Sequence, residues 1–324
     1  MRKIIYSLTI IISISLHSQN SSIAFTLNEK DLLPESIAHD PNTGAFYVGS
    51  TRKGTITKVD EKGNQSVFIR SGEFGQWMII GIKVDPQRNE LWFCSSGGNN
   101  LEGYSLKEET EGRPAGIFKV NLKTGELIKK YTLEKPGGTH FFNDLVIDEN
   151  GDVYASHMFA ESSIYKIDRN NDTLEPFARG DLMLYPNGLA IADNRTNLFV
   201  AHSGGIAKVS LKTGAITALA IANDLRLTKI ASADGLYFYE NHLIAIQPDL
   251  SQVAKYKLSQ YQDAIIEGEV LEINHSSMDH PTTGVLVDDS FYYIANAQFE
   301  KVGEDGSLEV SEVSAPVILK LDLK

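Results

Sequence analysis

The 324-residue chain has 42% hydrophobic and 22% charged residues, an ordinary globular composition, and its length suits one closed all-β domain. Its formal net charge of −12 argues against nucleic acid or an anionic membrane as a partner. The one cysteine, Cys94, excludes an intrachain disulfide, and its place in the apolar run 91–94 predicts a buried, inert thiol.

The first 22 residues have the pattern of a secretory signal peptide. Arg2 and Lys3 give a basic start, and the apolar run 4–16 is too short to cross a membrane but fits a secretory hydrophobic region. The small or polar residues 17–22 form the predicted processing region, although they lack a clean A-x-A site. We therefore predict a mature domain of residues 23–324 that is secreted or periplasmic. The alternative is that the apolar run forms a buried N-terminal strand.

Strand-length apolar runs separated by turn residues recur through the rest of the chain. No segment keeps apolar residues at helical spacing for three turns, which favours an all-β protein. Six of the runs follow a polar or glycine-bearing turn at intervals near the period of propeller blades. In chain order, these six runs are residues 36–40, 79–85, 144–148, 188–193, 235–240 and 284–289.

Each of the six runs begins a predicted four-stranded blade. The later strands, blade by blade, are residues 45–50, 55–60 and 66–70; 90–94, 116–121 and 126–133; 152–156, 163–168 and 173–178; 197–201, 205–211 and 215–221; 242–247, 252–258 and 267–273; and 291–295 and 317–323. The last blade lacks one strand, which residues 22–27 can supply from the other end of the chain. The predicted fold is therefore a six-bladed β-propeller in which the N-terminal strand closes the last blade and removes its open edge.

Neighbouring strands of a blade run in opposite directions, so the starts of the innermost strands share one end of the ring. The loops between second and third strands lie at the same end, and they are residues 50–53, 95–100, 157, 202, 248–249 and 296–298. The polar, glycine-rich insertion 95–115 is expected to be a loop over one face of the ring. We expect the functional site where these strand starts and loops meet.

Four innermost-strand starts carry oxygen donors, namely Glu35, Asn143, Asn187 and Asp234. Two carboxylates and two amides suit a hard divalent cation, with calcium as the first choice and another divalent ion such as magnesium as an alternative. Zinc would require histidine or cysteine at these positions. Each residue alone also fits ordinary turn chemistry. Their equivalent places in the repeat favour a shared metal site.

At these residues the chain resembles the gluconolactonase and senescence marker protein family, within the calcium-dependent propeller superfamily that includes diisopropyl fluorophosphatase and paraoxonase. The resemblance spans nearly the whole mature chain. It rests on Leu33-Pro34-Glu35-Ser36, Phe142-Asn143-Asp144, Pro186-Asn187-Gly188-Leu189 and Ala233-Asp234-Gly235. It implies that Glu35, Asn187 and Asp234 bind the ion, with Asn143 as a fourth ligand or a substrate contact and Asp144 behind it.

The chain departs from that family pattern next to Asn143. Sugar-lactone enzymes place an arginine two residues before this asparagine, where this chain has Phe141, preceded by His140. This change favours a more apolar ester or lactone over a polyol. The sequence shows no clear equivalent of the adjacent histidine pair of paraoxonase.

The predicted function is metal-dependent hydrolysis of a lactone or related small ester by a monomer. The cation would polarise the carbonyl group while a nearby base takes a proton from water. The candidate catalytic residues are Asp234, Asp144 and His280, and the candidate substrate contacts are Asn143, Phe141 and His140. The alternative is a non-catalytic propeller that binds a ligand or partner and holds a structural cation at its axis.

Overall fold

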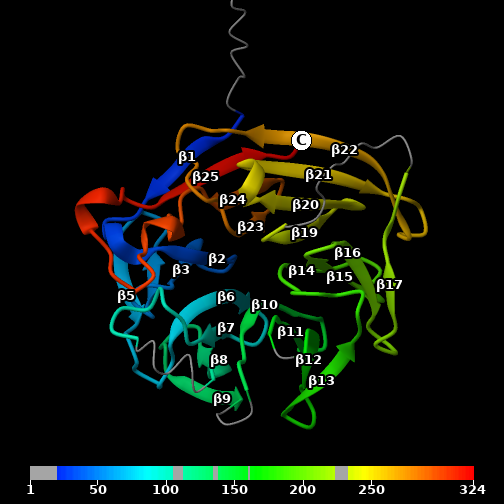
Figure 1. Ribbon diagram of the computed structural model, residues 1–324, viewed down its shortest axis with the longest axis horizontal. Helices are drawn as coiled ribbons and strands as arrows, with labels where there is room; N and C mark the ends of the chain where they lie inside the picture. The colour runs from blue at the N-terminus through cyan, green and yellow to red at the C-terminus, as the bar shows by residue number, and fades with distance from the viewer. Residues whose placement is uncertain (1–19, 105–111, 134–137, 160, 223–232) are drawn as a thin grey trace, which may run out of the picture.

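A computed structural model of the chain describes residues 20–104, 112–133, 138–159, 161–222 and 233–324. Six small sheets surround one axis, as in a six-bladed β-propeller, which confirms the predicted fold (Figure 1). Residues 1–19 of the predicted signal peptide and residues 105–111 of the predicted insertion lie outside the described residues. Among the described residues, the only helices are four 3-10 turns, and none is long and apolar enough to cross a membrane.

The first three blades each contain four antiparallel strands. They are β2 (Pro34–Asp40), β3 (Ala45–Ser50), β4 (Ile56–Val59) and β5 (Gln65–Ile69); β6 (Met78–Asp85), β7 (Glu90–Ser96), β8 (Ala115–Asn121) and β9 (Leu127–Leu133); and β10 (Phe142–Ile147), β11 (Val153–His157), β12 (Ser163–Asp168) and β13 (Thr173–Arg179). These strands agree with the predicted ones to within a few residues.

The last three blades follow the same order around the ring. They are β14 (Leu189–Ile191), β15 (Asn197–His202), β16 (Gly205–Ser210) and β17 (Ile216–Ala218); β19 (Leu236–Tyr239), β20 (His242–Gln247), β21 (Gln252–Leu258) and β22 (Ala264–Ile273); and β23 (Gly284–Val287), β24 (Ser290–Ile294), β25 (Val317–Asp322) and β1 (Ser22–Thr26). The 3-10 turns are η1 (Lys30–Leu32), η2 (Pro248–Leu250), η3 (Phe299–Lys301) and η4 (Val310–Glu312).

One predicted strand was wrong. Residues 215–221 do not form a single outer strand of the fourth blade, because β18 (Ala220–Ile221) leaves that blade and pairs in parallel with β22 of the fifth. Leu219, between β17 and β18, is buried in the cluster that joins these two blades. The hydrophobic free energy gained by burying Leu219 therefore favours the passage of the chain from the fourth blade to the fifth.

The N-terminal strand closes the ring as predicted, since β1 pairs antiparallel with β25 (Figure 1). Ser21, just before β1, is buried, and its backbone N–H donates to Glu272 Oε2 at 2.7 Å. Its hydroxyl lies 2.9 Å from the hydroxyl of Tyr293. This pairing supplies the fourth strand of the last blade, so that strands from the two ends of the chain lie in one sheet.

Apolar side chains fill the spaces between neighbouring blades. The first and second blades, for example, share a cluster that includes Tyr47, Ile79 and Phe93, with Phe93 stacked on Phe118. Cys94 is fully buried, and burial raises the pKa of its thiol well above the usual value, which confirms the predicted buried thiol. The blades therefore hold one another in place around the axis.

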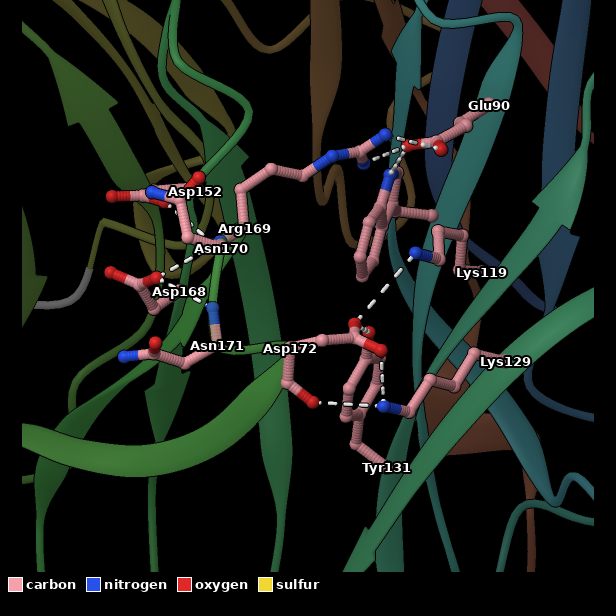
Figure 2. Close-up of polar contacts among 11 residues, drawn as sticks. Glu90, Lys119, Lys129, Tyr131, Asp152, Asp168, Arg169, Asn170, Asn171 and Asp172 are labelled. Carbon is pink, nitrogen blue, oxygen red and sulfur yellow. Dashed lines mark hydrogen bonds and ion pairs between the residues drawn. The ribbon is translucent and has the colours of Figure 1, made fainter.

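A polar cluster also joins the second and third blades (Figure 2). Arg169, in the turn after β12, donates two hydrogen bonds to the buried carboxylate of Glu90 on β7, at 2.7 and 2.9 Å. In the same turn, Asp172 contacts Lys129 and Tyr131 of β9. This pairing of buried and exposed charges fixes the third blade against the second.

Candidate functional site

The four predicted oxygen donors meet in one pocket at one end of the ring. The pocket has a volume of about 350 Å³ and is lined by Glu35, Asn143, Met158, Tyr185, Asn187, His202, Ser203, Ala233, Asp234, Pro248, Asp249 and His280. We call it the axial pocket. The predicted base candidate His280 also lines it, as do His202, Pro248 and Asp249 from the predicted loops between second and third strands. The donors come from four different blades, so only the closed ring brings them together.

Bulges at the strand starts explain how two of the donors leave the regular sheet. The pairing of β2 with β3 shifts between Pro34 and Ser36, so Glu35 has no partner in the ladder. The pairing of β10 with β11 shifts between Phe142 and Leu145, which frees Asn143 and Asp144 in the same way. A bulge re-aims a side chain relative to the alternation of an ordinary strand.

A close backbone approach brings the donors of the fourth and fifth blades together. A Cβ atom at Gly188, next to Asn187, would lie 2.3 Å from the backbone oxygen of Asp234. Only glycine allows this approach without displacing the chain. Gly188 is thus needed for the packing of the fourth blade against the fifth.

The axial pocket concentrates negative charge in a buried place. Glu35 and Asp234 are only 6% and 8% exposed. Burial raises the pKa of Glu35 well above its usual value, and the carboxylates of Asp234 and Asp144 raise it further. Burial also raises the pKa of Asp234 to about 6, against the opposing effects of His280 and of a hydrogen bond with Asn187. Buried carboxylates of this kind require a cation or protonation.

The donor set fits a hard cation. The side-chain oxygen of Asn187 is buried and makes no hydrogen bond within the described part of the chain. The described residues hold no group of three or more histidine, cysteine, aspartate or glutamate side chains suited to a metal. A cation held in the axial pocket would therefore be bound by two carboxylates and two amides, which are oxygen donors of the kinds found in calcium sites.

Asp144 is held by hydrogen bonds from three blades, and its predicted catalytic role remains a prediction. Its side chain is 3% exposed, and the carboxylate accepts hydrogen bonds from Lys83 Nζ at 3.1 Å and from the backbone N–H groups of Leu145 and Leu189 at 2.8 and 3.1 Å. These donors come from the second, third and fourth blades, so Asp144 ties together the strands beside Asn143 and Asn187. It is not among the residues that line the axial pocket.

A second pocket, which we call the side pocket, adjoins the first. Its volume is about 360 Å³, and its lining consists of Glu35, Thr51, Met78, Ile80, Gly98, Asn99, Asn100, Arg113, Phe141 and Phe299. Glu35 lines both pockets, so the apolar walls of the second begin beside the candidate metal ligands of the first. Phe141 lines the side pocket, and its predicted contact with a substrate remains a prediction.

The sequence did not indicate that an arginine stands beside Phe141. The guanidinium carbon of Arg113 lies 5.9 Å from the ring centre of Phe141 and 5.5 Å from that of Phe159. Arg113 belongs to the insertion before β8 and is 30 positions away from Asn143 in the numbering. An arginine thus reaches this region from another blade, although the position used by sugar-lactone enzymes holds phenylalanine.

The structure also reveals a histidine pair that the sequence did not suggest. His140 Nδ1 lies 3.1 Å from His157 Nε2, because the pairing of Phe142 with His157 brings β11 back beside residue 140. Burial, and then the neighbouring His140, lower the pKa of His157 to about 4. Burial lowers the pKa of His140 as well. His140 is not among the residues lining either pocket, so its predicted substrate contact remains a prediction.

The ring of His280 contacts two residues of η3. Its Nδ1 lies 2.7 Å from Glu300 Oε1, and its ring centre lies 5.3 Å from that of Phe299. Its backbone φ of 63° is uncommon for a residue with a side chain. Such a conformation persists only where the surrounding structure enforces it.

Comparison with known proteins gives the fold but no closer relationship. No protein-family model matches the sequence, and no curated protein matches it significantly. Among solved structures, the allergen Mala s 1 of Malassezia sympodialis has a TM-score of 0.68 at 13% identity, over 95% of this chain and 97% of that one. A luciferin-regenerating enzyme has a TM-score of 0.64 at 14% identity, over 91% of this chain and 93% of that one.

A gluconolactonase from Xanthomonas campestris gives a TM-score of 0.60 at 13% identity, over 94% of this chain and 95% of the other. At these identities the similarity concerns the fold alone. The protein is therefore a six-bladed β-propeller, and its structural neighbours include a gluconolactonase.

Proposed function

We propose that the protein is a metal-dependent hydrolase acting on a lactone or related small ester with an apolar part, in a secreted or periplasmic location. The observation that carries this proposal is the pairing of two pockets at Glu35. One pocket gathers buried oxygen donors from four blades, and the other has apolar walls. Structural neighbours titled gluconolactonase support the same class of reaction.

Glu35, Asn143, Asn187 and Asp234 would hold the cation, with calcium as the first choice. A bound divalent cation supplies Lewis acidity that polarises an ester carbonyl. The remaining chemistry falls to the chain itself. Met78, Ile80, Phe141 and Phe299 would hold the apolar part of the substrate, and the adjoining pocket would hold its carbonyl group.

Hydrolysis needs a base beside the carbonyl carbon. The oxygen of water bonds to that carbon while its proton passes to the base, and the bond from carbon to the leaving oxygen then breaks. The leaving oxygen takes up the proton, so a lactone yields a hydroxy acid. Asp234 and His280 both line the axial pocket. A carboxylate bound to a cation is a weaker base, so His280 fits the role at neutral pH, with Asp234 as a ligand.

The test is a hydrolysis screen on lactones and aryl esters with and without a chelator. We expect chelator-sensitive turnover, and we expect Asp234→Asn to lower it by at least about 100-fold because a cation ligand is weakened. Asp181→Asn, which changes an exposed carboxylate outside both pockets, serves as the matched control. Full turnover by Asp234→Asn would refute the proposal.

The rival function is a binding propeller with a structural cation. The buried oxygen donors of the axial pocket also favour this function, because a cation bound there would hold four blades together. The screen separates the two functions. If the protein hydrolyses none of the substrates and a chelator lowers its melting temperature, the binding propeller is indicated.

A further inference from the structure

We propose that Glu300 is a positioning residue that fixes the tautomer of His280, so that the unprotonated Nε2 of His280 faces the axial pocket as a proton acceptor. This inference rests on the proposed function for its catalytic consequence. The geometry that carries it is the 2.7 Å contact between Glu300 Oε1 and His280 Nδ1, on a histidine that lines the pocket with Asp234.

When the His280 ring is neutral, the chemistry of the two partners leaves one arrangement of the proton. A neutral imidazole carries hydrogen on one ring nitrogen and a lone pair on the other, whereas an ionised carboxylate only accepts hydrogen bonds. A contact between Nδ1 and Glu300 therefore places the hydrogen on Nδ1. The lone pair then lies on Nε2, the ring nitrogen that does not contact Glu300. A base oriented by a third group in this way is a recurring feature of hydrolytic sites.

The short turn η3 carries Glu300 and is fixed to the rest of the blade. Gln298, directly before η3, is 2% exposed and exchanges hydrogen bonds with the backbone of Ser314, accepting at 2.9 Å and donating at 3.1 Å. The backbone N–H of Lys301, the last residue of η3, donates to Gln298 at 3.1 Å. Glu300 thus stands on an anchored turn, although its own side chain is 68% exposed.

The backbone around His280 is fixed as well. The N–H of Ala297 donates to the carbonyl of His280 at 3.1 Å, and the N–H of Gln298 donates to that of Asp279 at 3.2 Å. These bonds join the segment before β23 to the segment after β24, which leads into η3. The ring of Phe299, which also lines the side pocket, packs against His280. The histidine and its carboxylate partner are therefore held on one local framework.

The first test is the ring protonation pattern of His280, read from 15N chemical shifts in the labelled full chain. His280→Gln identifies the signals. We expect a protonated Nδ1 and an unprotonated Nε2 in the wild type, and a loss of this preference in Glu300→Ala. Glu309→Ala, a change of another exposed glutamate after η3, is the matched control and should leave the pattern unchanged. An unchanged pattern in Glu300→Ala would overturn the inference.

The second test is steady-state kinetics on the best ester or lactone of the screen. We expect Glu300→Ala to lower kcat by about tenfold or more with little change in KM, a part of the 100- to 10,000-fold that a general base supplies. Adding Glu300→Ala to His280→Gln should cause no further loss, because the two residues act as a unit. Independent, multiplying losses would contradict the role.

The two proposals can fail separately. If no variant and no wild type hydrolyses any substrate, the proposed hydrolase function fails, while the 15N pattern still decides whether Glu300 sets the tautomer. If hydrolysis is found and Glu300→Ala keeps full kcat, the hydrolase proposal stands and the positioning role is refuted.

Discussion

Removing Arg169 should destabilise the propeller more than removing any exposed partner of an ion pair. The side chain of Glu90 is 7% exposed, and Arg169 gives it two charge-assisted hydrogen bonds (Figure 2). Without Arg169, the carboxylate of Glu90 would still accept a hydrogen bond from Trp92 Nε1, at 3.1 Å, but it would lose both bonds from the guanidinium group. Breaking a buried pair typically costs about 3–5 kcal/mol because one buried charge loses its partner.

The structure sets the expected cost at the lower end of that range. The side chain of Arg169 is 31% exposed, so water can enter the space that it leaves and solvate part of Glu90. We expect Arg169→Ala to lower the free energy of unfolding by about 3 kcal/mol. At roughly 2 °C per kcal/mol for a chain of this size, the melting temperature should fall by about 6 °C.

The assay is thermal and urea unfolding of matched variants. Arg179→Ala removes a partner of Glu161 in an exposed pair, and it should cost less than about 1 kcal/mol. Replacing both members, in Glu90→Gln with Arg169→Met, should recover much of the loss because no buried charge is left unpaired. The reasoning is refuted if Arg169→Ala is no more destabilising than Arg179→Ala.

Three further predictions concern the axis, the histidine pair and the side pocket. Gly188→Ala should weaken calcium binding in titration calorimetry, since the new Cβ would lie 2.3 Å from the backbone oxygen of Asp234. The control variant Gly180→Ala, whose new Cβ would meet only a side-chain methyl at 3.1 Å, should bind calcium normally. Equal calcium affinities of the two variants would count against the packing argument. The pKa of His157 is about 4 in the folded protein, so the unfolded chain binds more protons between pH 6.5 and 4. Stability should therefore fall by up to about 3 kcal/mol as pH drops through that window, and His157→Gln should flatten the pH dependence measured by urea unfolding. Ile80→Phe should fill the side pocket and reduce kcat/KM for bulky acyl esters about 10- to 200-fold relative to acetyl esters; a uniform change across substrates would place the acyl group elsewhere.

The sequence allowed most of the fold to be predicted because each blade repeats the same local pattern. Short apolar runs bounded by turn residues such as Asn187-Gly188 identify strands without any knowledge of their partners. The missing strand of the last blade also revealed the closure by β1. The crossing of β18 into the next blade could not be predicted, since it depends on the burial of Leu219 against side chains far away in the sequence.

The candidate ligands were predictable for the same reason, as equivalent positions of a repeat meet at the axis. The residues that surround these candidate ligands could not be predicted from the sequence. Arg113 comes from an insertion with no repeat pattern, and Lys83 reaches Asp144 only because neighbouring blades pack closely. Glu300 and His280 are joined by two irregular segments whose geometry is set by buried hydrogen bonds. Contacts of this kind depend on tertiary packing and leave no local signal in the sequence.

The most direct measurement is titration calorimetry of calcium into the chelator-treated protein, with Glu35→Gln combined with Asp234→Asn as the comparison and Asp181→Asn as the control. We predict one saturable site in the wild type and in the control, a rise in melting temperature on calcium addition, and loss of both in the double variant. Absence of saturable binding of calcium or magnesium to the wild type, or unchanged binding by the double variant, would contradict the metal site at the axis.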